Sequence, residues 1–309
     1  MTGYLVRRVA ALIPVALGVA TLTFALIHLV PGDPVIAMLG DTAGPADVAG
    51  LRHQLGLDRP LLAQYAEFLR GLAHGDLGES ISMKEPVARL IVERFPATLE
   101  LAGAAMLVAI ALAVPLGLIA GANPGGAADM GAMGFAILGI SVPHLCLGPL
   151  VMIVFSLKLG WLPLTGRGGL AHLMLPAVTM GTALAAILAR MLRQSLIQVR
   201  EADYIRSARS KGLSAFAALI RHGLPNALTP VITLLGLETG ALLTGAIVTE
   251  MIFSWPGMGR LLIAAISARD YPLVEGCVLT FAFTYVAVNM ATDLVYAIAD
   301  PRIRLLRAG

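Results

Sequence analysis

Few side chains in this sequence could do chemistry inside an apolar environment, and two acids stand out among them. Glu250 and Asp293 each interrupt a run of apolar residues long enough to cross a bilayer. An ionisable group inside a membrane span is costly to bury, so it is expected to serve a function or to be paired. A structural hydrogen bond, within the chain or to a partner subunit, is favoured over a proton or ion relay. Glu238 and Asn289 are the next candidates on the same ground.

A second group of reactive side chains lies in the segment "YIRSARSKGLSAFAALIRHGLPN", residues 204–226, which collects four basic residues. The pattern predicts two short helices, 204–211 and 215–222. Gly212 lies between them and can adopt the positive φ that ends a helix, and Ser214 can cap the second helix. A segment of this kind is too elaborate for an ordinary turn between two membrane spans.

The two helices of this segment differ in what they offer a partner. On the first, Tyr204, Ala208 and Lys211 share a face in which a small residue is flanked by larger ones, and such a face suits insertion into a groove. The second is expected to stop at Gly223 and Pro225. The alternative is a positively charged loop that orients the chain and touches anionic headgroups. The residues alone leave both interpretations open.

The motifs of the common enzyme classes are missing from the sequence. There is no H-E-x-x-H, no G-x-S-x-G and no G-x-x-x-x-G-K-[ST], and the dipeptide Gly-Lys does not occur. We therefore expect no catalytic residue, no bound metal and no cofactor on this chain, and no ATP hydrolysis by a P-loop mechanism.

The elements that must position these residues are membrane-spanning helices. The chain is 58% hydrophobic and only 13% charged, which makes the bilayer its solvent. A spanning helix needs roughly 20 predominantly apolar residues. Six runs meet this requirement, and the last two are interrupted by acids: Val9–Gly32, Leu101–Ala128, Met130–Leu157, Gly168–Ala189, Gly223–Met251 and Gly276–Ala299. The sequence therefore predicts an all-α, polytopic membrane protein with six transmembrane helices.

The basic residues indicate the orientation of these helices. With the N terminus inside, twelve Lys and Arg face the cytoplasm and ten face the other side, six of them in one long loop that is rich in acids. Long loops escape the positive-inside rule, so both termini are expected in the cytoplasm. Because the basic residues cluster beside the spans, and do not form a folded basic face, no nucleic-acid binding is expected.

The long first loop is expected to fold. Helical spacing of apolar residues predicts helices at 46–55 and 61–72, with Gly75 following the second, and a third at 86–94. We therefore divide the chain into a first transmembrane helix (1–32), an extracytoplasmic helical subdomain (33–96) and a five-helix core (97–309) that carries the cytoplasmic loop at about 200–226. The subdomain could be a docking surface or a lid that only buries its own apolar stripes.

The loop resembles a signature of the permease subunits of ABC importers, E-A-A-x3-G-x9-I-x-L-P. Ala208, Gly212, Leu224 and Pro225 match it, whereas the Glu, the first Ala and the Ile do not. Further stretches resemble the dipeptide and oligopeptide (peptide/nickel) permease family, and its B-type subunit in particular, in the order that this family shows: "HLVPGDP" (28–34), "RFPATLEL" (94–101), "GWLPLTG" (160–166), "DYIRSARSKGLS" (203–214), "FSWPGMGRLL" (253–262), "RDYPLVEG" (269–276) and "DPRIR" (300–304).

This resemblance implies a type I importer permease in the plasma (inner) membrane of a prokaryote. Its expected partners are a second, homologous permease, two ATPase subunits that carry ATP-Mg, an extracytoplasmic solute-binding protein and a peptide substrate. The resemblance also implies that the loop docks onto an ATPase. The residues expected at this contact are Tyr204, Ala208, Arg209, Lys211, Gly212 and Leu213, with Leu224 and Pro225 ending the loop.

The resemblance implies a specific role for four of these loop residues. Ala208 would keep the contact with the ATPase close, Gly212 would set the helix end, and Arg209 and Lys211 would meet acidic groups. The alternative function is a stand-alone, ion-coupled carrier that uses Glu250 and Asp293. That carrier would transport without an ATPase and would not depend strongly on Gly212. The family also includes members for nickel and glutathione, and the sequence does not separate these substrates.

Overall fold

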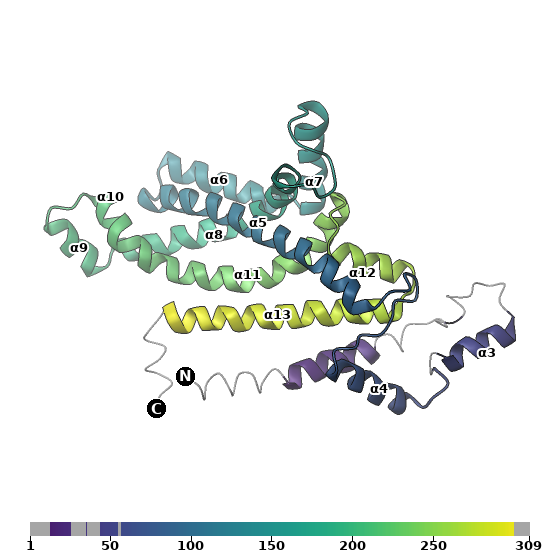
Figure 1. Ribbon diagram of the computed structural model, residues 1–309. Coiled ribbons are helices and arrows are strands. Elements are labelled where there is room, and N and C mark those ends of the chain that lie inside the picture. Colours follow the sequence, from purple (N-terminus) through teal and green to yellow (C-terminus); the bar gives the residue numbers. More distant parts are fainter. Residues whose placement is uncertain (1–12, 26–34, 36–43, 55–56, 300–309) are drawn as a thin grey trace, which may run out of the picture. The chain divides into compact units, whose positions relative to one another are not determined.

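The computed structural model describes residues 13–25, 35, 44–54 and 57–299. These residues form helices and connecting turns, with one isolated antiparallel bridge between Glu79 and Pro86 and no longer strand among them. The all-α prediction is therefore confirmed. In chain order the described elements are the helix Ile13–Ala25, α3 (Pro45–Gln54), α4 (Leu61–Ala73), α5 (Val87–Ala122), α6 (Ala127–Ser141), α7 (His144–Val151), the π-helix η1 (Met152–Lys158), α8 (Leu170–Arg200), α9 (Asp203–Ser210), α10 (Ala215–Ala218), the π-helix η2 (Leu219–Gly223), α11 (Leu224–Ile252), α12 (Met258–Ser267) and α13 (Tyr271–Ala299) (Figure 1).

Four helices in the described part of the chain are long and apolar enough to cross a membrane, so the polytopic class is confirmed. A fifth candidate is a bent pair, in which α6 and the segment Leu145–Lys158 meet at 106°. Pro143 lies at this bend, where its ring and missing N–H prevent α6 from continuing. The first predicted span, 9–32, is described only over Ile13–Ala25, and its remainder lies outside the described residues.

Two helix boundaries differ from the prediction. The helix predicted at 86–94 and the second span form a single helix, α5, and α8 continues past Ala189 to Arg200. A charge-free run marks only the part of a helix that suits lipid, whereas the backbone hydrogen bonds of the helix extend beyond it into a polar environment. The basic residues at 190–200 are therefore helical and do not belong to a loop.

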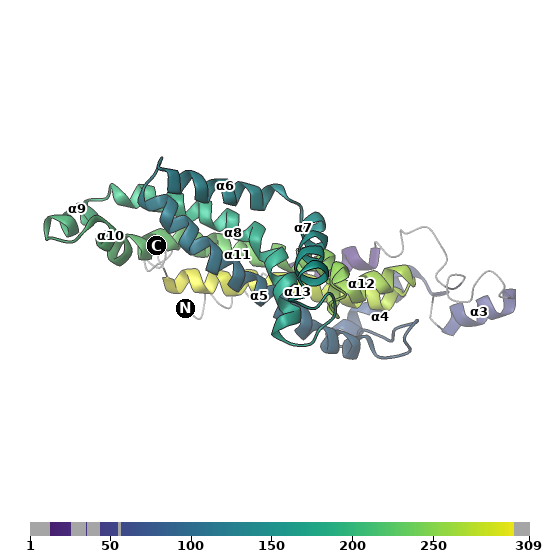
Figure 2. The same cartoon turned by 90° about the horizontal axis from the view of Figure 1, so that it is seen from above.

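The chain divides into two compact units, and the larger comprises 97–256 and 287–309. Within it α5, α6, α8 and α11 lie side by side in both views (Figures 1 and 2). Small residues recur every four positions on the face of α5 that packs against α8. A Cβ at Gly117 or Gly121 would lie 2.8 Å from the Cβ of Leu192 or Leu196. Lipid provides no hydrophobic driving force for helix association. The close approach of these two helix backbones therefore holds them together by van der Waals contact.

The smaller unit comprises 1–96 and 257–286. One of its cores joins the start of α5 to α12 and α13 through buried side chains that include Val87, Met258 and Leu273. Beside this core, the Asp270 carboxylate accepts hydrogen bonds from the hydroxyls of Ser80 at 2.6 Å and Ser82 at 2.7 Å. A short turn of the long first loop is thus fixed to the N-terminal end of α13.

The long first loop contains the helices that apolar spacing predicted. The predicted helices at 46–55 and 61–72 correspond to α3 and α4, and Gly75 follows α4 with a φ of 74°. In α4, Tyr65 contacts the helix Ile13–Ala25, because its hydroxyl lies 2.6 Å from that of Thr21 and its ring lies 5.2 Å from the ring of Phe24. The three-part division at 32 and 96 stays a prediction.

Candidate functional site

The segment 200–226 has the local geometry that its sequence predicts, apart from its last turn. After α9, Gly212 adopts a φ of 94° and donates its N–H to the Arg209 carbonyl at 3.0 Å. Ser214 then caps α10, where its hydroxyl accepts the backbone N–H of Ala217 at 3.2 Å. A left-handed residue and a side-chain cap therefore fix the angle between the two short helices.

The predicted stop at Gly223 and Pro225 is wrong. The chain passes from α10 through η2 directly into α11 without leaving helical geometry. Pro225 lies in the first turn of α11, where a missing N–H is tolerated, and the π-helical turn before it accommodates the change of hydrogen-bond register. Helix α10, η2 and α11 are therefore one continuous helical path.

Ala208 lies on the inner side of α9. It is only 8% exposed and packs in a small cluster with Ile205 and Ala218. Its small size lets α9 lie close to α10, as glycine or alanine does wherever two helices must approach. In this chain Ala208 therefore holds the segment together, and side chains on the outer side of α9 and α10 make up its exposed surface.

The exposed side chains of this segment include two aromatic rings and several cations. Tyr204 is 43% exposed and Phe216 is 62% exposed, and Arg209 and Lys211 are exposed without an acidic partner among the described residues. Arg206 is paired loosely with Asp203 at 3.6 Å. We name Tyr204, Arg209, Lys211 and Phe216 the outer face. Exposed aromatic and arginine side chains are enriched at protein interfaces.

The base of the segment is joined tightly to the helical core of its unit. Leu219 is buried in that core, and Leu224 packs against it. A Cβ at Gly223 would come within 3.2 Å of Val199 and 3.0 Å of Leu219, so any larger residue would push these side chains back by a few tenths of an ångström. In both views α9 and α10 lie at one end of α8 and α11, and α7 lies toward the other (Figures 1 and 2).

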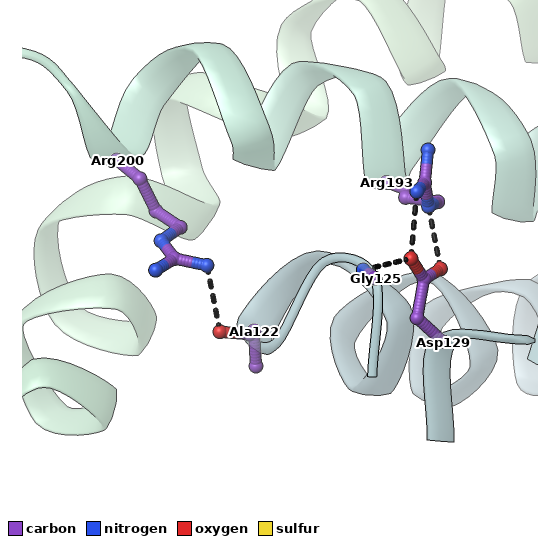
Figure 3. A network of polar contacts seen from close by, with 5 residues as sticks. All are labelled: Ala122, Gly125, Asp129, Arg193 and Arg200. Carbon is purple, nitrogen blue, oxygen red and sulfur yellow. Dashed lines mark hydrogen bonds and ion pairs between the residues drawn. The ribbon is translucent and has the colours of Figure 1, made fainter. Parts of the chain in front are cut away.

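A polar network ties the same end of α8 to α5 and α6 (Figure 3). The Arg193 guanidinium donates to both oxygens of the Asp129 carboxylate, with two distances of 2.6 Å. The backbone N–H of Gly125 also donates to Asp129 at 2.8 Å, and Arg200 donates to the carbonyl of Ala122 at 2.9 Å. The turn between α5 and α6 is thus fixed to α8 a short distance before α9 begins.

Sequence reasoning missed both members of this ion pair. In the sequence Asp129 only separates two apolar runs and Arg193 follows the end of another, yet their side chains are only 4% and 27% exposed. The signal that could have found them is charge of opposite sign at the same predicted membrane depth. Phe216 was also missed, because one aromatic residue in a mixed segment carries no pattern of its own.

The structure describes the side chain of only one of the two intramembrane acids, Glu250 and Asp293. Glu250 is fully buried near the end of α11, and the Thr98 hydroxyl donates to its carboxylate at 2.6 Å. This contact is the structural hydrogen bond between helices that the sequence favoured. Asp293 belongs to α13, but its side chain lies outside the described residues. Among the described residues, no three His, Cys, Asp or Glu side chains are grouped so that they could hold a metal ion.

Contacts near Glu250 join the first half of α5 and the end of α11 to the 159–169 connection. The indole N–H of the fully buried Trp255 donates to the Ala97 carbonyl at 2.8 Å, and the Arg167 guanidinium lies 5.9 Å from the Trp255 ring centre. Arg167 also donates twice to Glu100, at 2.6 and 2.9 Å. Three stretches that resembled a known family, "RFPATLEL", "GWLPLTG" and "FSWPGMGRLL", contribute to or adjoin this cluster.

Several apolar spans around a close-packed core, with a structured segment at one end, define a polytopic helical membrane protein. Residues 113–305 match the family described as "Binding-protein-dependent transport system inner membrane component". Residues 1–102 match the N-terminal component family of the same transport systems. The chain therefore belongs to this family and is a multi-pass permease subunit of an ABC importer.

Curated relatives match over nearly the whole chain. The sequence is 42% identical to the di/tripeptide transport system permease protein DppB of Pseudomonas aeruginosa, and 40% identical to the dipeptide transport system permease protein DppB of Escherichia coli K12. It is 41% identical to the glutathione transport system permease protein GsiC of Pectobacterium atrosepticum. Each match covers 98% of this chain and 99% of the relative.

Solved structures share the fold at low sequence identity. The inward-facing MetNI methionine ABC transporter gives a TM-score of 0.56 at 15% identity, covering 71% of this chain and all of that chain. An amino acid ABC transporter gives a TM-score of 0.54 at 15% identity, covering 68% of this chain and 94% of that chain. The permease fold predicted from the sequence is confirmed.

Proposed function

We propose that this permease passes short peptides, and that it does so as one half of a pathway completed by a second, homologous permease. The observation that carries the proposal is the identity of 40% to 42% with DppB proteins over 98% of the chain. Because one relative at 41% identity is a glutathione permease, we include modified tripeptides such as glutathione in the proposed substrate class. An extracytoplasmic binding protein is expected to deliver the peptide, since the family is defined by dependence on such a protein.

The outer face of the 200–226 segment is the proposed docking surface for a cytoplasmic ATPase. Its aromatic residues, Tyr204 and Phe216, would fill a cleft, and Arg209 and Lys211 would face acidic groups. Gly212 sets the angle that presents these side chains together, while Ala208 and Leu213 pack beneath them. In this arrangement both chain termini face the cytoplasm, and the 33–96 subdomain faces the opposite side.

Motion of the ATPases would reach the membrane helices through the base of this segment. Helix α9 follows α8 after two residues, and η2 runs directly into α11. The pair Asp129–Arg193 couples α6 to α8 near this end. A displacement of the docked segment would therefore move α6, α8 and α11 together, as expected for a rigid-body change between inward-open and outward-open states.

In this scheme the chain gates the pathway and does not catalyse. ATP-Mg would bind to the two ATPase subunits, and the free energy of closing their dimer would drive the change of state. Leu224 is partly buried against the core and Pro225 is exposed, so the end of the segment would act as the joint between docking surface and pathway helix.

Peptide uptake into proteoliposomes that contain the complete transporter tests the proposal against the ion-coupled carrier. We expect uptake of a labelled dipeptide that requires binding protein and ATP and persists without an ion gradient. The carrier would instead take up peptide with this chain alone and an ion gradient, and would lose uptake in Glu250→Gln or Asp293→Asn. Uptake by this chain alone would overturn the proposal.

A further inference from the structure

A cavity of about 110 Å³ lies between α8 and α11, and Glu238 is its one charged lining residue. Met180, Leu184 and Leu242 provide apolar walls, and Ala241 and Gly245 leave the space open. An added Cβ at Gly245 would meet no atom within 4 Å, which agrees with empty space on this side of α11. The lining positions on α11 recur at intervals of three and four residues, so one face of the helix forms the wall.

The cavity lies halfway along both helices. Glu238 is the fifteenth of the 29 residues of α11, and Leu184 is the fifteenth of the 31 residues of α8. Because each residue advances a helix by 1.5 Å, the carboxylate lies roughly 20 Å from either end of α11. Substrate sites of many membrane transporters lie near the middle of their spanning helices.

The Glu238 carboxylate has no hydrogen-bond or ion-pair partner among the residues that the structure describes. It differs in this from Glu250, whose carboxylate accepts the Thr98 hydroxyl. An unpaired carboxylate between membrane helices is costly, and the cost is relieved when a cation binds beside it. The side chain is therefore suited to a cation that enters and leaves.

The chemistry of the cavity favours an organic ammonium over a metal ion. Sodium, calcium and magnesium require several oxygen ligands, whereas the other side chains that line this cavity are apolar and offer none. An ammonium group on an alkyl chain needs one carboxylate and gains from apolar walls around its methylene groups. A free peptide carries such a group at its N terminus, and a lysine residue carries a second.

We propose that Glu238 is a substrate-binding residue of the translocation pathway, and that its carboxylate accepts a primary ammonium group of the passing peptide. This inference rests on the proposed function, since it needs a peptide in the pathway. The cavity walls take the alkyl part of the substrate, and the small residues Ala241 and Gly245 keep room for it. A single charge-assisted contact holds the peptide without trapping it.

The test compares uptake of alanyl-lysine and alanyl-norleucine, which differ only in the terminal ammonium group of the side chain. Both are offered below saturation to proteoliposomes holding the complete transporter, as wild type, Glu238→Gln or Glu79→Gln. Glu79 is an exposed acid of the smaller unit and serves as the charge-matched control. We expect Glu238→Gln to lower alanyl-lysine uptake about tenfold more than alanyl-norleucine uptake, as loss of one charge-assisted hydrogen bond implies.

The remaining outcomes separate the alternatives. If Glu238→Gln lowers the uptake of both peptides equally and leaves the thermal denaturation midpoint unchanged, the N-terminal ammonium is the group that Glu238 binds. Equal loss at a lowered midpoint assigns Glu238 a structural role and overturns the inference. Unchanged uptake of both substrates overturns it as well, while the proposed function stands. A wild-type transporter that takes up neither peptide overturns the proposed function and the inference together.

Discussion

Arg193 of α8 and Asp129 of α6 face each other through two hydrogen bonds of 2.6 Å, in the geometry that holds a guanidinium and a carboxylate most firmly. The pair lies a short distance before the segment that we propose as the docking surface. The pair adds a polar contact between α6 and α8, which also pack against each other elsewhere along their length. Neither residue belongs to the outer face, so we expect its loss to affect transport without releasing the ATPases.

We predict that Asp129→Asn and Arg193→Gln each lower the thermal denaturation midpoint and the rate of peptide uptake, because each leaves a mostly covered charge without its partner. The double variant should lose less stability than the two single losses combined, since the unpaired charge is then gone. Arg190→Gln, at an exposed position three residues earlier, is the matched control. Additive losses would show that the two side chains do not act as a pair.

Gly212 should tolerate no Cβ without strain, because its φ of 94° lies where side chains are rarely found. We expect Gly212→Ala to destabilise the α9–α10 turn by about 1 kcal/mol. The turn should then exchange its amide hydrogens faster, which hydrogen exchange with mass spectrometry measures. Gly131→Ala, in the open middle of α6, should instead be neutral or slightly stabilising. An unaltered exchange rate in Gly212→Ala would contradict this part of the account.

Trp255 should matter for stability far more than Trp161, the second tryptophan of the chain. Trp255 is fully buried and donates to the Ala97 carbonyl, whereas Trp161 is 69% exposed. Trp255→Phe removes a buried donor and is predicted to lower the free energy of unfolding by about 1–3 kcal/mol. Trp161→Phe should change it by less than about 0.5 kcal/mol. Denaturant titration of both variants in detergent measures the difference, and equal effects would disprove it.

Asp270 should make the smaller unit sensitive to acid. Burial raises the pKa of its carboxyl, but hydrogen bonds from Ser80, from Ser82 and from the Ile81 backbone outweigh burial, so the pKa lies below its ordinary value. A lowered pKa stabilises the fold above the unfolded value of about 3.9, and this stability is lost as the pH falls through the folded value.

The thermal midpoint of the wild type should therefore fall more steeply than that of Asp270→Asn as the pH is lowered from about 5 to about 3. Asp47→Asn, which removes an exposed acid of α3, should follow the wild type. A parallel pH dependence of wild type and Asp270→Asn would contradict the assignment of this acid sensitivity to the Ser80 and Ser82 contacts.

Apolar runs and turn residues predicted much of this fold, because both depend on local chemistry. The stop after α9 at Gly212 and the cap at Ser214 follow from backbone conformation and one side-chain hydrogen bond, and both could be read from neighbouring residues. The ends of α5 and α8 could not be predicted in this way, because each helix extends beyond its charge-free run. The continuous path from α10 into α11 depends on a π-helical turn that no local pattern indicates.

Contacts between distant segments were the part that the sequence did not predict. Asp129 and Arg193 are 64 positions apart, and Thr98 and Glu250 are 152 positions apart, so only the packing of helices brings them together. Ala208 was expected to touch a partner, but packing turns it toward Ala218 and leaves Phe216 exposed. The face that a short helix presents depends on what packs behind it, which spacing alone does not determine.

Retention of the ATPase subunits by this permease in detergent tests the central claim most directly. The comparison is between wild type, Phe216→Asp on the outer face, and Leu62→Asp, which alters an equally apolar and 80% exposed side chain of α4. The account predicts that wild type and Leu62→Asp retain the ATPases equally, and that Phe216→Asp retains at least about tenfold less, as loss of a central aromatic contact implies. Equal retention by Phe216→Asp and wild type would contradict it.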